Sequence, residues 1–465
     1  MKNTEEKEIF RDRISTVNKE GQRNWVYALK PKGIFYNYRI ALAFLYFIVF
    51  FSLPFIKVNG EPFLMLNIVE GKFIWFSKIF WPQDFFIFAI AMITFIVFII
   101  LFTIIYGRLF CGWVCPQTVF MEFIFRPIEW LIEGSPNSQK KLKAEGWTAN
   151  KIIRKTLKHT LYLLISFAIA HTFLAYILGI DHVVKIIREP LADHLVLLSG
   201  LIIFTLLFYG VFAFVREIVC TTICPYGRLQ SVMTDKNTMQ ISYDYHRGEP
   251  RGRFRKNEVR SQGDCVDCLK CIQVCPTNID IRNGVQMECV GCTACIDACD
   301  EVMDSLNFKR GLIRYASENQ IHDQKEFKFN NRIKAYSALL LLLIGFMVFL
   351  VIRFKHLDCY ISRVKGQLYQ ETATGGISNL FEAKIINKTN RRIPVTLRLD
   401  NLEGHIKIVG RDSFNLEKEK VNDFTFFLEI PASQIHERST DINFGLYEGE
   451  ERIQTISSKF LGPFK

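Results

Sequence analysis

The sequence predicts a polytopic α-helical membrane protein with about five spans, a cysteine-rich α+β insert before the last span, and an immunoglobulin-like β-sandwich after it. Three observations support this prediction: long uncharged apolar runs, cysteines gathered in tight groups, and short alternating runs in the last hundred residues. Phenylalanine alone accounts for 42 of the 465 residues. Apolar runs of this length need a lipid environment rather than a water-facing core.

Five stretches have roughly the 20 apolar residues that a helix needs to cross the hydrocarbon of a bilayer. They lie near 39–57, 85–106, 160–180, 195–215 and 335–353. The first carries Pro54 near its end, so a buried or re-entrant segment is the alternative there. The lipid bilayer is therefore an expected partner of the chain.

The basic residues crowd beside these spans. A net charge of +12 would suggest nucleic acid as a partner of a soluble protein. Here the positive-inside rule explains it better, so no nucleic-acid partner is expected. The rule makes the N-terminus, the 107–159 loop and the 216–334 segment cytoplasmic. An odd number of spans then places the tail on the other side.

The predicted domains follow from these spans. Residues 1–38 are a cytoplasmic lead-in of mixed charge without the apolar core of a secretory signal. Residues 39–230 form a four-span membrane domain, 231–334 the cytoplasmic insert, and 335–353 the fifth span. Residues 354–465 show alternating runs at 381–386, 395–399 and 406–409, separated by turn residues. This pattern predicts an antiparallel sandwich of the immunoglobulin type.

The insert holds two cysteine quartets with one shared spacing. The first reads C-x2-C-x2-C-x3-C before Pro276, and the second repeats that spacing. This is the pattern of bacterial two-cluster ferredoxins, in which three cysteines hold one 4Fe–4S cluster and the fourth reaches the other. The predicted ligands of the first cluster are Cys265, Cys268, Cys271 and Cys299. Those of the second are Cys275, Cys289, Cys292 and Cys295.

Zinc is the alternative occupant of these quartets. Zinc sites use two CxxC pairs rather than tandem quartets with a common offset, so the spacing favours two clusters. Gly291 and Ala294 let backbone amides approach the sulfurs, and such hydrogen bonds help to set the reduction potential. One departure is Asp300, which stands where bacterial ferredoxins usually have proline. The insert is thus predicted to relay electrons.

Two shorter C-x3-C-P motifs each begin a few residues beyond a predicted span. They are Cys111 with Cys115, and Cys220 with Cys224. Because positions i and i+4 share a helix face, the four thiols are predicted to converge at the cytoplasmic membrane surface. Arg108 and Arg216 precede the motifs at similar positions, which makes the two halves a weak internal repeat.

Four interpretations of these pairs compete. The thiols could ligate a third cluster, bind a soft metal such as Cu(I), or act as redox dithiols toward a metal substrate. Plain packing cysteines are common, but they do not explain the repetition. The sequence favours metal or cluster ligation without separating the first three. A last thiol, Cys359, stands alone after the fifth span and is expected to be incidental.

The order of these parts resembles the cytochrome c oxidase accessory protein family, known as CcoG, FixG or RdxA. The resemblance lies in CGWVCPQ from Cys111, CTTICPYGRLQ from Cys220, CVGCTACIDACDEVMD from Cys289, and the RVKGQLY stretch from Arg363. It covers nearly the whole chain. The ferredoxin motif alone would be unspecific, whereas its combination with paired C-x3-C-P motifs is specific.

The resemblance implies a protein of the bacterial inner membrane with a periplasmic tail. It implies help in assembling cbb-type cytochrome c oxidase, by reduction of Cu(II) to Cu(I), and hence cupric reductase activity at Cys111, Cys115, Cys220 and Cys224. The expected partners are oxidase subunits or a copper chaperone or transporter, with an unknown electron donor. A quinol-linked subunit feeding a periplasmic reductase, and a non-catalytic scaffold with structural clusters, are the alternatives.

Overall fold

The computed structural model describes residues 20–463 except 21, 59, 68–70, 76–77, 81–84, 255–261, 324–330, 354–356, 365, 367, 373–374, 390 and 411–413. Most of the predicted lead-in, and part of the RVKGQLY stretch, therefore lie outside the described residues. The chain forms two compact units. The first comprises Met1–Ser52, Ile90–Ala175 and Asp181–Gly345, and the second comprises Leu53–Ala89, Tyr176–Ile180 and Phe346–Lys465.

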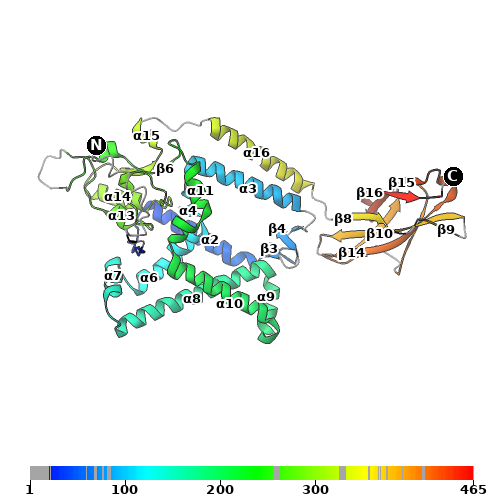
Figure 1. The fold of residues 1–465 in the computed structure, drawn as a ribbon, viewed down its shortest axis with the longest axis horizontal. Helices are drawn as coiled ribbons and strands as arrows, with labels where there is room; N and C mark the ends of the chain where they lie inside the picture. Colours follow the sequence, from blue (N-terminus) through cyan, green and yellow to red (C-terminus); the bar gives the residue numbers. More distant parts are fainter. Residues whose placement is uncertain are drawn as a thin grey trace. The chain divides into compact units, whose positions relative to one another are not determined.

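Five helices of the described chain are long and apolar enough to cross a membrane, which confirms the predicted number of spans. They are α2 (Ile34–Ser52), α3 (Phe85–Tyr106), α8 (Ala149–Leu178), α10 (Leu195–Gly210) and α16 (Asn331–Ile352) (Figure 1). Pro54 lies in a 3-10 turn, Leu53–Phe55, directly after α2. Helix α8 begins at Ala149 rather than near residue 160, because its charged first turns continue the same helix.

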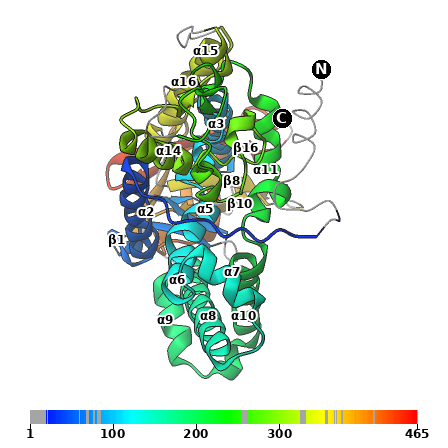
Figure 2. The same cartoon turned by 90° about the vertical axis from the view of Figure 1, so that its left-hand side faces the viewer.

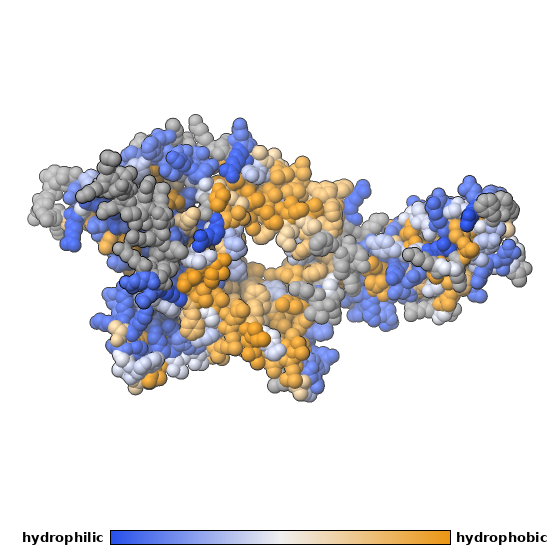
Figure 3. Space-filling model, viewed as in Figure 1, coloured by the Kyte–Doolittle hydropathy of each residue, from blue (hydrophilic) through white to orange (hydrophobic). Residues whose placement is uncertain are grey.

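The long helices keep large apolar side chains on their outer surfaces. Phe86, Ile203 and Leu341 are 58%, 64% and 71% exposed. Figure 3 shows these apolar residues gathered in orange over the helices, with hydrophilic blue residues beyond their ends. An apolar surface of this extent is typical of contact with lipid.

Within the first unit, α8 and α10 lie side by side (Figures 1 and 2). Phe173 contacts Phe204 with ring centroids 5.6 Å apart, and Tyr209 hydrogen-bonds to His159. Three five-residue π-helical segments continue or follow the spans: η3 (Met121–Phe125), η5 (Val211–Val215) and η6 (Val219–Ile223). Such π segments occur frequently at functional sites.

Short helices connect the spans to one another, and the last of them leads into the insert. They are α4 (Leu109–Trp113), α5 (Pro116–Phe120), α6 (Arg126–Ile132), α7 (Pro136–Ala144), α9 (Ile180–Arg188), η4 (Leu191–His194) and α11 (Pro225–Met233). Ser135 caps α7 by accepting a hydrogen bond from the Ser138 amide, and proline at the first position starts α5, α7 and α11. Proline suits this position because its missing N–H has no partner there in any case.

The insert has an α+β fold, as predicted. Strands β6 (Gln240–Tyr243) and β7 (Ile313–Ala316) pair antiparallel, so the two ends of the insert meet. Between them lie α12 (Tyr245–Gly248), α13 (Lys270–Gln273), η7 (Ile281–Asn283) and α14 (Ala294–Ser305), and α15 (Glu318–His322) follows β7. The buried core combines aliphatic side chains with the cysteines themselves.

The C-terminal part is a two-sheet sandwich, which confirms the prediction of an immunoglobulin-like domain. One sheet has the order β12-β14-β10-β8 with β9 beside β10, and the other has the order β13-β11-β15-β16. The strands are β8 (Leu357–Arg363), β9 (Gln370–Glu371), β10 (Gly376–Asn387), β11 (Ile393–Leu399), β12 (His405–Ile408), β13 (Phe414–Leu416), β14 (Val421–Pro431), β15 (Ser439–Glu448) and β16 (Glu451–Leu461). Alternate residues of β14, from Phe424 to Ile430, point into the core. Cys359 is one of the core residues, at 1% exposure.

The segment between α2 and α3 contains strands that the sequence analysis did not predict. Strands β1 (Lys57–Val58) and β2 (Glu61–Pro62) form a pair. Strands β3 (Leu64–Asn67), β4 (Lys72–Trp75) and β5 (Lys78–Phe80) form an antiparallel sheet. Met65, Ile74 and Ile79 are its small buried core.

Candidate iron–sulfur and dithiol site

The insert contains a first cavity, partly open to solvent, of about 360 Å³ including that open space, and four cysteines line it. They are Cys265, Cys268, Cys271 and Cys299. The rest of the wall is mostly apolar and includes Val302, Met303 and Leu312. The fold thus brings together the same four residues that the spacing assigns to one cluster.

A second cavity of about 320 Å³ lies in the same module. It is lined by Cys275, Cys289, Cys292 and Cys295, together with Cys271. Ile241, Ile279 and Ile281 complete its wall. These are the cysteines that the spacing assigns to the other cluster.

Two left-handed residues turn the chain around these cavities. Leu269 has φ = 59° and precedes α13, while Thr293 has φ = 61° and precedes α14. Residues other than glycine rarely adopt positive φ, and here one of them directly follows the second cysteine of each quartet. The Gly291 amide hydrogen-bonds to the Cys289 sulfur and the Ala294 amide to that of Cys292. Amides directed at cysteine sulfur in this way favour an anionic thiolate cluster.

In the insert, the cysteines line two cavities and do not converge on the position of a single metal ion. Among the described residues, no three His, Cys, Asp or Glu side chains come close enough to hold one metal ion. Four thiols around an apolar space fit a cubane, which takes one thiolate at each iron. The donor set and the cavity wall therefore suit 4Fe–4S clusters.

The two C-x3-C-P motifs share one backbone arrangement, but it is not the single helix that the sequence analysis assumed. Cys111 lies in α4 and Cys220 in η6, whereas Cys115 and Cys224 are extended N-cap residues with ψ of 125° and 114°. The prediction of a common helix face is therefore wrong. The cause is the following proline, whose ring disfavours the helical conformation of the residue before it.

The four thiols nevertheless lie near one another. Burial raises the pKa of Cys111 and of Cys220 to about 12, and neighbouring thiols of the other motif add to the effect. The Cys111 sulfur lies 3.3 Å from Gln230 Oε1 in α11. The two motifs, more than 100 residues apart in sequence, thus form one group, to which we refer as the dithiol site (Cys111, Cys115, Cys220 and Cys224).

The dithiol site packs directly against the second cysteine cavity. Cys111 and Cys220 contact a buried group that includes Val290, Cys292 and Ala298. A Cβ atom on Gly112 would lie 2.7 Å from the Gly291 carbonyl carbon, and one on Gly291 would lie 2.8 Å from the Arg108 carbonyl oxygen. Two facing glycines therefore allow the two backbones to touch.

Two arginines tie the membrane helices to this contact. Arg39 of α2 donates from Nε to the Gly112 carbonyl at 3.1 Å. Arg108 donates from Nε to Gln230 at 3.1 Å and from Nη1 to the Met287 carbonyl. In the sequence, Arg39 stands out only as one of the basic residues that orient the spans, and Arg108 only as another of these and as part of the weak repeat. Their roles depend on long-range contacts that no local pattern signals.

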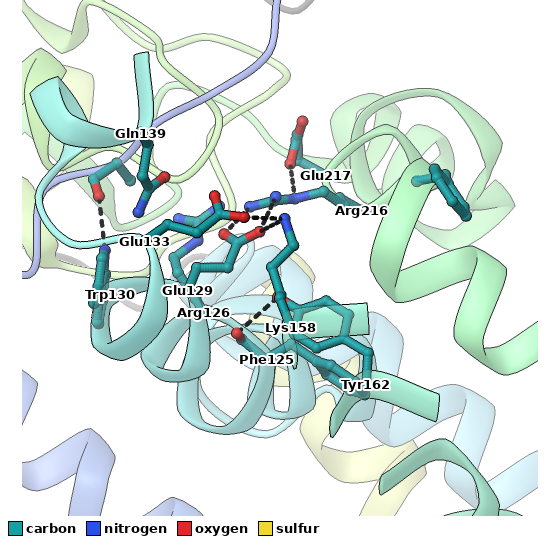
Figure 4. A network of polar contacts seen from close by, with 12 residues as sticks. Phe125, Arg126, Glu129, Trp130, Glu133, Gln139, Lys158, Tyr162, Arg216 and Glu217 are labelled. Carbon is teal, nitrogen blue, oxygen red and sulfur yellow. Dashed lines mark hydrogen bonds and ion pairs between the residues drawn. The ribbon is translucent and has the colours of Figure 1, made fainter. Parts of the chain in front are cut away.

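A buried network of charges, shown in Figure 4, includes Arg126 and Arg216, which line one pocket together with Cys220. Arg216, 1% exposed, binds the Glu129 carboxylate through two hydrogen bonds of 2.7 and 3.0 Å. Lys158 lies 2.9 Å from Glu133 and 3.6 Å from Glu129. Burial alone would raise the pKa of Glu129, but Arg216, Lys158 and Arg126 outweigh it and the pKa falls below its ordinary value. The network fixes α6 and α8 to the chain that enters the second C-x3-C-P motif.

Three family profiles match the chain. A 4Fe–4S dicluster domain covers residues 215–318, and a 4Fe–4S binding domain covers residues 88–134. An immunoglobulin-like fold found at the C-terminus of FixG, a putative oxidoreductase, covers residues 347–463. The first two profiles include both cysteine cavities and both C-x3-C-P motifs.

Three curated proteins are similar to this chain over more than half of their own length. Protein RdxB of Cereibacter sphaeroides is 32% identical over 381 residues, which are 77% of this chain and 79% of RdxB. The chain belongs to the FixG/RdxA family. Protein RdxA of the same organism is 30% identical over 77% of this chain and 78% of its own. The nitrogen fixation protein FixG of Rhizobium meliloti is 31% identical over 64% of this chain and 58% of its own length.

A solved structure also matches part of this FixG/RdxA family member. It is a FixG-related protein from Vibrio parahaemolyticus, 21% identical, with a TM-score of 0.21. The match covers 24% of this chain and all of that one. With its membrane helices and 4Fe–4S domains, the chain is an iron–sulfur electron-transfer protein of the FixG/RdxA family.

Proposed function

We propose that this protein is a cupric reductase of the bacterial inner membrane that supplies Cu(I) for assembly of a cbb-type cytochrome c oxidase. The observation that carries the proposal is the packing of Cys111 and Cys220 against the second cysteine cavity. Electron-transfer cysteines and soft metal ligands then share one buried contact. An external one-electron donor is required.

Each part of the chain has a role in this proposal. The eight cysteines of the insert hold two 4Fe–4S clusters, which supply one-electron storage and transfer when bound. The dithiol site binds the copper substrate, because thiolates favour Cu(I) over harder ions. Copper takes up one electron, so Cu(II) becomes Cu(I), and this step neither consumes nor releases a proton. The same thiols could hold a third cluster instead, and iron content separates these cases.

The proposed topology follows the distribution of basic residues. The N-terminus, the 107–159 loop and the insert at 231–334 lie in the cytoplasm, and the tail at 354–465 lies in the periplasm. The sandwich then docks an oxidase subunit or a copper chaperone on the periplasmic side. Cysteine labelling of intact cells at one residue on each side tests this assignment.

The direct test removes one thiol of each motif. The double variant Cys111→Ala with Cys220→Ala should keep about eight irons per chain and lose most Cu(II) reduction, because the copper ligands are gone and the clusters remain. Cys359→Ala is the matched control, since this buried thiol lies in the sandwich core, and it should leave both readouts unchanged. Unchanged Cu(II) reduction in the double variant would contradict the role of the dithiol site. Loss of about four irons in that variant would indicate a third cluster.

A further inference from the structure

We infer that Arg39 and Arg108 raise the reduction potential of the cluster beside the dithiol site above that of the other cluster. The proximal cluster is the one held by Cys275, Cys289, Cys292 and Cys295, and the distal cluster is the one held by Cys265, Cys268, Cys271 and Cys299. Electrons would then collect next to Cys111 and Cys220. The inference needs only the two clusters and no particular acceptor.

Arg39 is a buried cation that lacks a carboxylate partner in the described part of the chain. It is 2% exposed, and its Nη2 atom has no hydrogen-bond partner there. Its guanidinium lies over Phe123, 5.1 Å from the ring centroid. The carbonyl that it binds belongs to Gly112, whose Cβ position is 2.8 Å from Cys292 Cα. A buried charge without a partner is costly, and an anionic cluster at this position supplies the missing counter-charge.

Arg108 places a second cation on the same cluster. Its Nη1 donates to the Met287 carbonyl and lies 3.5 Å from that of Cys289. Its Nη2 donates to the Gly227 carbonyl, so its hydrogen-bond partners within the described residues are all neutral groups. Glu288, which directly precedes Cys289 in sequence, is a negative charge that opposes the effect of Arg108 on that thiol. The second acidic neighbour, Asp297, accepts hydrogen bonds from the Phe35 and Tyr36 amides of α2, so its carboxylate is engaged there rather than by either arginine.

The distal cluster has a different electrostatic surrounding. Its nearby cation, Arg282, is neutralised by ion pairs with Asp280 and Asp267. Asp300 stands directly after Cys299 and adds a negative charge. The cations at the two sites are therefore unequal: two without carboxylate partners at the proximal cluster, and one paired twice at the distal cluster.

Solvent exposure acts in the opposite direction. Cys268 is exposed, and water stabilises the extra negative charge of a reduced cluster. This concerns one of the four distal cysteines, since Cys265 and Cys271 are buried. Interactions between buried charges are several times stronger than those at the surface. The buried Arg39, together with the half-buried Arg108, should therefore outweigh one exposed thiolate.

The two arginines could also serve only as clamps between α2, α4 and the insert. A clamp and a charge differ in their effect on the potential. Arg39→Gln removes the charge and keeps a side chain that can still donate a hydrogen bond. Arg39→Lys keeps the charge with a different hydrogen-bonding geometry. Only an electrostatic role predicts that lysine restores the potential.

The test is an anaerobic redox titration of the full chain in detergent, without copper, followed by EPR. The wild type should show two one-electron steps that differ at least tenfold in equilibrium constant, or about 59 mV. Arg39→Gln and Arg108→Gln should each lower the equilibrium constant for reduction at the upper step at least threefold. Arg39→Lys should restore that constant. The control Arg282→Gln should lower only the other step, because it leaves two carboxylates unpaired.

Several outcomes would overturn the inference. They are a single potential for both clusters in the wild type, an upper step that neither glutamine variant moves, or an equal loss in Arg39→Lys and Arg39→Gln. If Arg39→Gln fails to bind iron, Arg108→Gln gives the same comparison from a different element. Because copper is absent, failure of the proposed cupric reduction would leave this measurement unaffected.

Discussion

Gly112→Ala should separate the dithiol site from the proximal cysteine cavity without touching a sulfur. The added methyl group would lie 2.7 to 2.8 Å from the Gly291 carbonyl carbon, the Val290 carbonyl oxygen and Cys292 Cα. All three are backbone atoms, so no flexible side chain can move aside. Ordinary contacts of a Cβ atom begin at 3.4 Å, so the two backbones must part by about 0.7 Å, which is 3.4 minus 2.7 Å.

Two opposing contributions determine the free energy of unfolding of Gly112→Ala. Overpacking of a tight contact costs about 1–3 kcal/mol. Alanine regains up to about 1 kcal/mol of helix propensity in α4. The net expected destabilisation is thus about 0–2 kcal/mol, too small to unfold the protein. The consequence lies instead in a longer gap between the proximal cluster and the thiols.

The assay measures the rate at which Cu(II) oxidises prereduced clusters, together with iron content and thermal loss of cluster absorbance. Gly112→Ala should keep its iron and react several-fold more slowly. Gly210→Ala is the matched control, because a Cβ there meets nothing within 4 Å. It should react at the wild-type rate and be slightly more stable. If Cu(II) oxidises the clusters of Gly112→Ala at the wild-type rate, electrons do not depend on the glycine contact to reach the dithiol site.

Three further predictions concern the buried charges and the ligands. Arg216→Gln should destabilise the membrane domain by about 3–5 kcal/mol, because the buried Glu129 loses the partner that makes both of its short hydrogen bonds, and Lys158 remains only at 3.6 Å. Arg216→Met with Glu129→Leu should cost far less, and equal thermal midpoints for the two variants would contradict this. The pKa of Glu129 is lowered in the folded protein from its ordinary value of 4.5. Ionised Glu129 therefore stabilises the fold fully above pH 4.5, and this contribution is lost as the pH falls through the pKa of Glu129 in the folded state. Glu129→Gln should therefore flatten the acid limb of a stability–pH profile, and an unaltered limb would disprove the assignment. Cys275→Ser should lose about four of about eight irons, whereas Cys359→Ser should lose none, as iron analysis can check.

Much of the fold follows from local patterns in the sequence. A span needs only length and uncharged composition, so α3 was predicted at its observed bounds, Phe85–Tyr106. The sandwich follows from alternation, because every second residue of β14 is buried. The cysteine quartets depend on spacing over a few residues, and the fold gathers the expected sets around two cavities.

The remaining features depend on contacts between distant residues. No pattern around Arg39 indicates Gly112 as its partner, 73 residues away. The Glu129–Arg216 pair joins two segments 87 residues apart, and each looks like an ordinary helix charge in sequence. The extended Cys115 and Cys224 could have been predicted, since each precedes a proline and such residues avoid the helical region. The four-residue spacing of the cysteines suggests one helix, but the following proline determines the conformation of Cys115 and Cys224.

In the proposed reaction, reduced clusters deliver electrons to copper at the dithiol site. The most direct measurement adds Cu(II) to anaerobically reduced protein and follows iron, copper and the EPR signals together. We expect about eight irons per chain, and cluster signals that disappear as Cu(II) becomes EPR-silent Cu(I), one electron for each copper. Reduced clusters that persist beside Cu(II) but are oxidised by a quinone would contradict this reaction and favour a quinol-linked relay.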